Sequence, residues 1–309
     1  MNYTLHQLKV FSYITRLKSI TKASEALHLS QPAVSIQLKN LQDQFEIPLT
    51  EVIGRNIHIT EFGYEVAQSA AVILKEIQNL EQRASLFQNK LVGELNISTV
   101  STGKYILPYL LSYFSSLYPE VKLNIDVTNK AKVTESLERN SIDFALVSVL
   151  PKSPQLNYIE LLDNNLYWVG SANEHQKFDD AVKDKGLIFR EQGSATRQAM
   201  ENYLITNQYN YKKAYELTSN EAVKQAVIAG LGISLMPLIG VLEEIKTKKI
   251  KLLDANDLPI KTQWQIVWIK NKKLGPAASE FLKICSEKKE EILNQHILGQ
   301  QKIMKKQNI

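Results

Sequence analysis

Four polar side chains in one short segment have the types that contact nucleic-acid bases. They are Gln31, Ser35, Gln37 and Lys39. A glutamine amide can bond adenine through two atoms, and a lysine ammonium can reach guanine or a phosphate. Residues suited to contact with the phosphate backbone lie on either side: Thr21, Lys22, Ser30, Arg55 and Asn56. A solvated polar face would have a similar composition, so the elements that hold these residues decide between the two interpretations.

A second set of polar residues follows the ends of expected strands. Ser101, Thr102 and Gly103 come after one strand, and Gly193, Ser194, Thr196 and Arg197 come after another. Hydroxyls and backbone N–H groups at two helix N-termini suit a carboxylate, phosphate or sulfate. Further candidates for the same ligand are Thr128, Asn129, Ser148 and Gly232. Helix capping alone would explain Ser101 and Thr196. Arg197 either pairs with an anion or lies on the surface.

Residues 30–45 are expected to form the helix that holds the first set. An apolar stripe recurs every three or four residues, which places it on one face: Val34, Leu38, Leu41 and Phe45. The opposite face carries Pro32, Ala33, Ile36, Lys39 and Asn40. Ser30 can cap this helix, and Pro32 is tolerated in its first turn. The connection to a preceding short helix, residues 28–30, fits only a helix-turn-helix corner, which is a common way to present a helix to the DNA major groove.

Two further elements complete this first region. Leu5, Leu8, Phe11, Ile14 and Leu17 predict a helix packed beneath the corner. Two short β-rich runs, 52–53 and 57–59, flank a Gly-Arg-Asn turn and predict a hairpin. The hairpin would be a wing whose tip carries Arg55 and Asn56, although a plain connector remains the alternative. Together these elements predict a winged helix-turn-helix.

A long helix is expected from Thr60 onward. Two series of apolar residues, each with a spacing of seven, interleave along it: Val66, Ile73, Leu80 and Phe87, and Ala70, Ile77, Ala84 and Leu91. Interleaved heptad positions are typical of a coiled-coil seam, so the helix is expected to form a homodimer. The alternative is an amphipathic helix lying on its own domain.

From residue 94 strands and helices alternate, which predicts a parallel sheet covered by helices. Strands are expected at 95–100, 121–127 and 144–149, with helices at 106–117 and 133–139. Further strands are expected at 166–169, 187–189, 215–217, 233–235 and 264–269, and a last helix begins at Pro276. Two α/β lobes with the chain crossing between them would leave a ligand cleft at the strand ends.

Composition and charge narrow the class of protein. The net charge is +5, but residues 1–60 contribute six basic against four acidic side chains, a net of +2, whereas residues 241–309 contribute fourteen against eight, a net of +6. Nucleic-acid binding therefore rests on the helix pattern and not on overall basicity. Cys285 is the single cysteine, which excludes an intramolecular disulfide and fits a reducing compartment. The N-terminal residues do not resemble a secretory signal, and the sequence has no long uncharged apolar segment, so we expect a cytoplasmic protein without membrane contact.

The sequence shows no arrangement typical of an enzyme. The five histidines lie far apart, and no metal-ligand spacing, nucleophile elbow, phosphate loop or dinucleotide fingerprint occurs, so no cofactor or metal is expected. Cys285 lies beside apolar residues and is expected to be a small buried side chain. Two other classes stay open as alternatives: a solute-binding module with a helical appendage, and an α/β enzyme with a docking domain.

Along nearly its full length the chain resembles the LysR-type transcriptional regulators. The most specific match is Thr-Lys-Ala-Ser-Glu-Ala-Leu-His-Leu-Ser-Gln-Pro-Ala-Val-Ser at 21–35, supported by Ile-Thr-Glu-Phe-Gly at 59–63. The resemblance implies an α/β chain with a winged helix-turn-helix at 1–60, a linker helix at 61–90 and an effector-binding domain at 91–309. That domain would have two lobes like a periplasmic binding protein, lobe I at about 91–160 and 266–295 and lobe II at about 161–265, followed by a basic tail with Lys302, Lys305 and Lys306.

The resemblance also implies partners. Family members bind promoter DNA as dimers or tetramers, and a small molecule in the cleft changes how they bend it. We expect this chain to bind double-stranded DNA and a small anionic effector. Segments 101–108 and 193–197 look most like the branch that regulates carbon fixation or sulfur assimilation. Ile36 and Val52 replace arginines that are usual in the family, which indicates fewer phosphate contacts, and Ile36 could instead touch a thymine methyl group.

Overall fold

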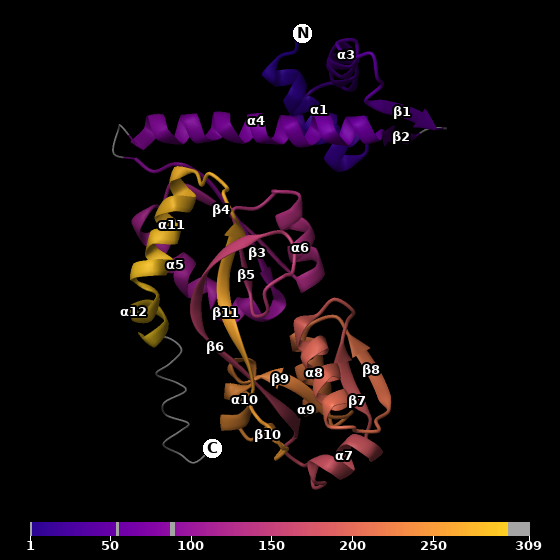
Figure 1. The fold of residues 1–309 in the computed structure, drawn as a ribbon, viewed down its shortest axis with the longest axis vertical. Helices are drawn as coiled ribbons and strands as arrows, with labels where there is room; N and C mark the ends of the chain where they lie inside the picture. The colour runs from indigo at the N-terminus through magenta and orange to yellow at the C-terminus, as the bar shows by residue number, and fades with distance from the viewer. Residues whose placement is uncertain (1, 54–55, 87–89, 296–309) are drawn as a thin grey trace. The chain divides into compact units, whose positions relative to one another are not determined.

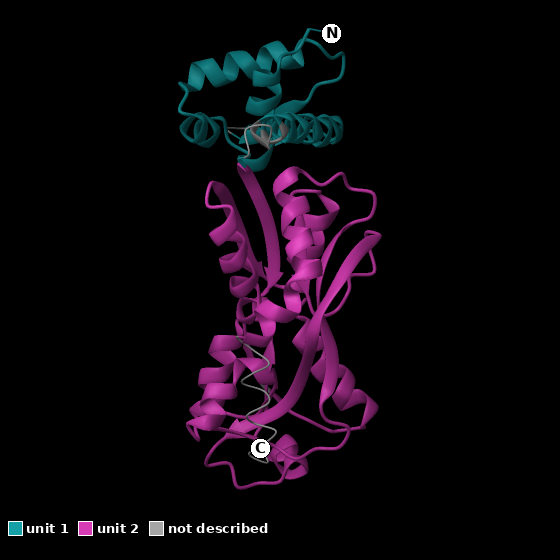
Figure 2. Cartoon of the chain, turned by 90° about the vertical axis from the view of Figure 1, so that its left-hand side faces the viewer, with its two compact units in different colours: residues 1–90 teal, residues 91–309 magenta. Residues whose placement is uncertain are grey.

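The computed structural model describes residues 2–53, 56–86 and 90–295 of the 309-residue chain. The chain divides into two compact units, residues 1–90 and residues 91–309, coloured separately in Figure 2. The basic residues expected in a C-terminal tail, Lys302, Lys305 and Lys306, lie outside the described residues. In the described part of the chain, no helix combines the length and the apolar character needed to cross a membrane.

The first unit is helical with one hairpin. Its elements are α1 (Leu5–Leu17), α2 (Ile20–Leu27), α3 (Gln31–Gln42), β1 (Thr50–Ile53), β2 (Asn56–Ile59) and α4 (Glu61–Leu86). The predicted stripe on α3 is confirmed, because Val34, Leu38 and Leu41 are buried in the core of this unit. The helix ends at Gln42, before the expected Phe45, whose ring instead packs edge-on against Phe62 with centroids 5.5 Å apart.

The long helix α4 has two different halves. Its first half lies on its own unit, because Ala70 is buried there and Val66 and Ala67 pack against the same core. Further along, Ile73 is 39% exposed and Leu80 is 67% exposed. The predicted heptad series does not extend to Leu91, which belongs to the core of the second unit, and Phe87 lies outside the described residues. The exposed apolar residues at heptad spacing therefore lie in the part of α4 that follows Ala70.

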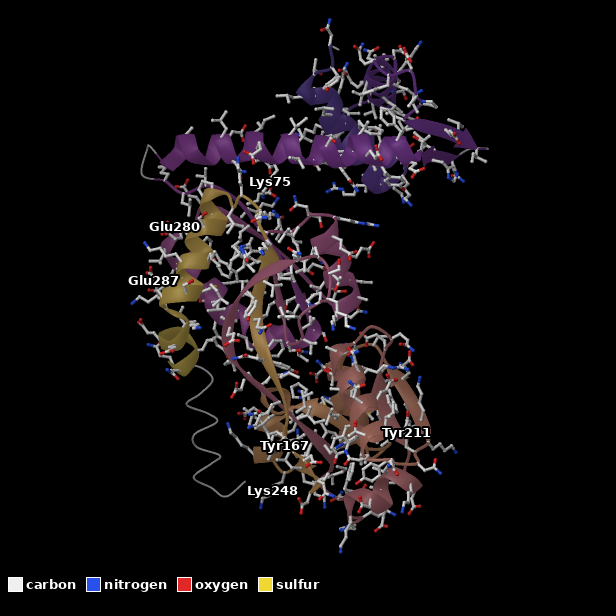
Figure 3. The ribbon with its side chains drawn as sticks, in the orientation of Figure 1. Lys75, Tyr167, Tyr211, Lys248, Glu280 and Glu287 are labelled. Atoms are coloured by element: carbon white, nitrogen blue, oxygen red, sulfur yellow. The ribbon has the colours of Figure 1, made fainter. Side chains whose placement is uncertain are left out.

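Lobe I of the second unit contains the predicted βαβαβ arrangement. Its elements are β3 (Gly93–Val100), η1 (Ser101–Tyr105), α5 (Leu107–Leu117), β4 (Val121–Thr128), α6 (Lys130–Glu138) and β5 (Phe144–Val147). Strand β3 pairs in parallel with both β4 and β5, as expected. The chain returns to cover this lobe with α11 (Pro276–Glu287) and α12 (Lys289–Leu293). Glu280, labelled on α11 in Figure 3, accepts a 3.0 Å hydrogen bond from the Tyr118 hydroxyl.

Two long strands join the lobes. Strands β6 (Leu156–Ser171) and β11 (Ile260–Ile269) pair antiparallel and run along the second unit in Figure 1. Near the crossing, the Asn164 side-chain amide donates to the Thr262 hydroxyl at 2.8 Å. The strands predicted at 166–169 and 264–269 are only parts of β6 and β11. In the first half of β6, polar residues interrupt the apolar pattern that would indicate a strand.

Lobe II packs around the far ends of these strands. Its elements are α7 (Phe178–Asp184), β7 (Leu187–Arg190), α8 (Ala195–Thr206), β8 (Lys213–Leu217), α9 (Asn220–Ile228), β9 (Ser234–Pro237), η2 (Leu238–Gly240), α10 (Leu242–Lys246) and β10 (Ile250–Leu252). Strands β9 and β10 pair with β6, so one sheet spans both lobes in the order β10-β6-β11-β5-β3-β4, with β9 on β6. Strands β7 and β8 form a separate parallel pair.

Candidate functional site

The outer side of α3 is exposed and carries several of the predicted base-contacting residues. Gln31, Pro32, Lys39 and Asn40 are exposed, and Ile36 at the centre of this side is 56% exposed. Ser35 and Gln37 are half-buried at its edges. The Ser30 hydroxyl accepts a 3.3 Å hydrogen bond from the Ala33 N–H, so Ser30 is the N-cap of α3. The buried stripe and the cap thus fix which side of α3 faces outward.

Helix α2 and the hairpin supply the other candidates for DNA contact. Thr21 and Lys22 are exposed in the first turn of α2, where the Ser19 hydroxyl accepts from the Lys22 N–H at 3.2 Å. In the hairpin Ile53 pairs with Asn56, and Asn56 is exposed. Arg55 lies outside the described residues. Val52, which replaces a usual arginine of the family, is 75% exposed, so both replaced positions present an apolar side chain to solvent.

A narrow polar pocket, with room for about one water molecule, lies between the two lobes of the second unit. Its lining joins the carboxyl ends of β3, β4 and β5 in lobe I to the turn after β7 and the start of α8 in lobe II. The lining residues are Val100, Ser101, Thr102, Asn129, Lys130, Ser148, Arg190, Ser194, Ala195 and Thr196. The structure therefore brings together six of the predicted effector-binding residues: Ser101, Thr102, Asn129, Ser148, Ser194 and Thr196.

Helix capping accounts for only part of this polar lining. Asn129 caps α6 through a 3.1 Å bond from the Lys132 N–H, and Ser194 caps α8 through a 3.5 Å bond from the Arg197 N–H. Ser101 and Thr196 are not N-caps, because those positions belong to Val100 for η1 and to Ser194 for α8. The capping alternative raised for Ser101 and Thr196 is therefore wrong.

Three glycines and a threonine of the predicted set lie outside this lining. A Cβ on Gly103 would come within 1.9 Å of the Thr99 hydroxyl oxygen, and one on Gly232 within 2.7 Å of the Gly186 carbonyl oxygen, so both positions serve close packing. Gly193 has φ +81°, and a Cβ there would lie 2.9 Å from the Ala131 Cβ in lobe I. Thr128 ends β4, where it pairs with Val100.

Arg197 is also outside the lining. It is buried in lobe II, where its Nε donates to Glu201 at 2.7 Å and its Nη1 donates to Glu216 at 2.8 Å and to the Arg190 carbonyl at 3.1 Å. Burial would lower the pKa of the Arg197 guanidinium, but the hydrogen bonds that it donates to Glu216 and Glu201 raise it. The sequence predicted that Arg197 either pairs with an anion or lies on the surface. In the structure it is buried, and carboxylates of the protein pair with its charge.

The pocket contains two cations that the sequence analysis missed. Arg190 is 3% exposed; its Nε and Nη2 donate to Glu191 at 2.8 and 2.9 Å, and its Nη1 donates to Asn220 at 2.5 Å. Lys130 is the first residue of α6. Lys130 comes directly after Asn129, a predicted binding residue. Arg190 comes directly after the expected strand 187–189. Position at a strand end was the signal that could have identified both.

A larger hollow, of about 300 Å³, lies elsewhere in lobe I between α5 and β4. Its lining is mainly aliphatic and includes Leu107, Leu111, Leu123 and Ile125. Thr99, Lys104, Ser112 and Ser115 also line it, but all its walls belong to lobe I, whereas the smaller pocket brings polar residues of both lobes together. The smaller polar pocket is therefore the better candidate for the predicted anion.

Comparison with known proteins agrees with this architecture. Residues 5–64 match the bacterial regulatory helix-turn-helix protein family model of the lysR family, and residues 88–290 match the LysR substrate binding domain. The RuBisCO operon transcriptional regulator of Allochromatium vinosum is 34% identical over 286 residues, covering 91% of this chain and 95% of the relative. The transcriptional activator CmpR of Synechocystis sp. is 35% identical over 286 residues, covering 91% and 94%.

A solved structure is similar to the second unit. The CcmR regulatory domain of Synechocystis PCC6803, in complex with 2-PG, has a TM-score of 0.59 and 31% sequence identity, covering 62% of this chain and 95% of that domain.

A winged helix-turn-helix joined to a two-lobed effector-binding domain defines a DNA-binding transcriptional regulator that responds to a small molecule. The chain belongs to the LysR family of these regulators, and its named relatives place it in the branch that includes CbbR and CmpR.

Proposed function

We propose that the pocket between the lobes is the effector site and that its ligand is a small anionic metabolite. The observation that carries this proposal is the lining itself, in which hydroxyls from both lobes lie beside Lys130 and beside Arg190, whose charge is shared with Glu191. Residues at the N-termini of α6 and α8 also line the pocket, namely Asn129, Lys130, Ser194 and Ala195. Helix N-termini favour negative charge. The 2-PG complex of the CcmR domain supports an anionic ligand.

For DNA, we propose that α3 inserts into the major groove and that the hairpin contacts the adjacent backbone. The residues assigned to base edges are Gln31, Ser35, Ile36, Gln37 and Lys39, and those assigned to the backbone are Thr21, Lys22, Ser30, Pro32, Arg55 and Asn56. The exposed side of α3 supports this assignment, because its charged and amide side chains surround Ile36. The chain is proposed to act in the cytoplasm, where bacterial promoter DNA lies.

The chain is also proposed to form a homodimer through α4, and two dimers could then form a tetramer. Exposed apolar residues at heptad spacing support this, since Ile73 and Leu80 lie seven residues apart and both are exposed. We further propose that the second unit binds its ligand without converting it, as the names of its relatives indicate for transcriptional regulators.

A ligand screen on the full-length protein tests the effector proposal. A ligand present at a hundred times its Kd stabilises the native state by about 2.7 kcal/mol, which corresponds to about 5–10 °C in the melting temperature of a unit of this size. The screen uses 2-PG and other small anions at matched ionic strength. If none of them shifts the melting temperature, the effector proposal is wrong. The promoter of a RuBisCO operon is the first DNA to test by footprinting, because one relative is named for it.

A further inference from the structure

The pocket between the lobes is too narrow for a metabolite in the described arrangement, since it has room for about one water molecule. At its edge the lobes are in contact, because the Asn220 amide of lobe II donates to the Ser101 hydroxyl of lobe I at 3.4 Å. The lining comes from both lobes, so the pocket widens when the lobes move apart along β6 and β11. Contacts that hold the lobes together beside the pocket therefore control the entry of an effector.

A second contact between the lobes lies outside the pocket lining. Tyr105, at the end of η1 in lobe I, lies against Gly240, at the end of η2 in lobe II. A Cβ on Gly240 would come within 3.0 Å of both the Tyr105 hydroxyl oxygen and a ring carbon of Tyr105. The tyrosine ring thus reaches the backbone of lobe II only because position 240 has no side chain.

An ion pair next to Tyr105 also joins the lobes, and it is easily separated. The Lys104 ammonium of lobe I lies 3.9 Å from the Glu221 carboxylate of lobe II, and both side chains are partly exposed. Exposed pairs of this kind contribute little to stability. Glu221 also pairs with Lys224 on its own helix at 3.2 Å, so it keeps a cationic partner when the lobes part.

The Tyr105 hydroxyl opposes the closed arrangement. It is buried and has no hydrogen-bond partner among the described residues. Burial raises the pKa of this phenol, so the group stays a neutral hydroxyl. A buried hydroxyl without a partner costs free energy, and that cost is removed when the lobes separate and water reaches the group. Weak attractions and one penalty therefore meet at Tyr105, and a small change at this contact can shift the balance between closed and open lobes.

We propose that Tyr105 and Gly240 form a latch between the lobes, which keeps the pocket closed without ligand and must open before an effector enters. The inference rests on the proposed effector site. Neither residue lines the pocket, so both are positioning residues that act on binding through the placement of the lobes. If only the open form admits the effector, the apparent affinity rises and falls with the open fraction.

Two uncharged substitutions at the latch should change affinity in opposite directions. Gly240→Ala places a methyl group against the Tyr105 ring, favours open lobes and should tighten effector binding about fivefold or more. Tyr105→Phe removes the hydroxyl without a partner, favours closed lobes and should weaken binding about fivefold or more. The matched control is Gly170→Ala, whose methyl group would lie 3.3 Å from atoms of Glu174 and Leu253, all within lobe II.

Calorimetry on the full-length protein measures these affinities. The first probe is 2-PG, and the second is the small anion that shifts the melting temperature most in the ligand screen. A variant that is merely destabilised would not bind more tightly, so a gain in affinity for Gly240→Ala separates a latch from a structural role.

Distances between spin labels test the latch without any ligand. The labels are attached at Glu138→Cys on α6 of lobe I and at Lys183→Cys on α7 of lobe II, two exposed positions. Cys285 is buried and is expected to stay unlabelled. Excess unlabelled protein gives each labelled chain an unlabelled partner. Gly240→Ala is expected to add a second interlobe distance to that of the wild type, and Tyr105→Phe to leave only the main distance.

The outcomes separate the latch from the effector site. If Gly240→Ala changes neither the distances nor the affinity, or if Gly170→Ala changes them equally, the latch is wrong and the effector site stands. A probe that binds the wild type without changing the interlobe distance would also overturn the latch, because the pocket would then widen by side-chain movement alone. If no anion binds, the proposed effector site fails, and the label distances still decide whether this contact holds the lobes closed.

Discussion

Ile36 lies at the centre of the exposed side of α3, a position where the family usually has arginine. We predict that Ile36→Arg adds a phosphate contact and so raises affinity for DNA at low salt. The plot of log K against log salt concentration should steepen by about 0.9, the contribution of one neutralised phosphate. Fluorescence anisotropy over a range of salt concentrations measures both effects. Leu231→Arg, at an exposed position of the second unit, is the control for added charge. Unchanged affinity and slope would show that this side of α3 does not face DNA.

Cys285 is buried on α11 among apolar residues. Burial raises the pKa of its thiol to about 12. Because the thiolate is the reactive species, the native protein should resist iodoacetamide at pH 8 and react only after unfolding. Mass spectrometry of the alkylated peptide checks this directly. Rapid labelling of the folded protein would contradict the buried position.

At the scale of single elements, α4 carries the proposed dimer contact. Replacing Ile73 and Leu80 by glutamate places charges at two exposed heptad positions and should convert the dimer to a monomer. Sedimentation velocity over a range of protein concentrations measures the change. Gln68→Glu and Gln78→Glu together add the same charges at other exposed positions of α4 and should leave the dimer intact. If the first variant remains dimeric at low concentration, the seam lies elsewhere.

The elements that sequence reasoning found share strong local signals. The apolar stripes of α1 and α3, the Ser30 cap of α3, and the alternation from β3 to β5 predicted these elements to within a few residues. Long-range pairing was harder to predict. The first half of β6 is held by its register with β11, which depends on residues about a hundred positions away. Arg190 ends β7, a position that pointed to it, but its place beside Ser101 arises only when the two lobes fold together.

At the scale of the whole molecule, an effector can regulate DNA binding only if it favours one arrangement of the two lobes and if that arrangement affects α3 through the rest of the chain. Strands β6 and β11 are the paired strands through which both lobes share one sheet, with Asn164 and Thr262 bonded near the crossing. A ligand that bonds to both lobes can stabilise one relative orientation of the lobes across these strands. In a dimer that change can alter the spacing of two α3 helices on DNA, whose bending energy depends on such geometry.

This coupling predicts that the anionic effector and promoter DNA change each other's binding affinity equally. If an anion changes the affinity for promoter DNA by some factor, DNA must change the affinity for the anion by the same factor, typically about 5 to 150. Calorimetry with the anion that binds most tightly, performed with free and with DNA-bound protein, gives one ratio. Anisotropy with and without the anion gives the other, and the two should agree. In the variant with glutamate at positions 73 and 80, anion binding should persist while the ratio falls toward one, because a monomer presents a single α3. An anion that binds strongly yet leaves DNA affinity unchanged in the wild-type dimer would show that the pocket does not control DNA affinity.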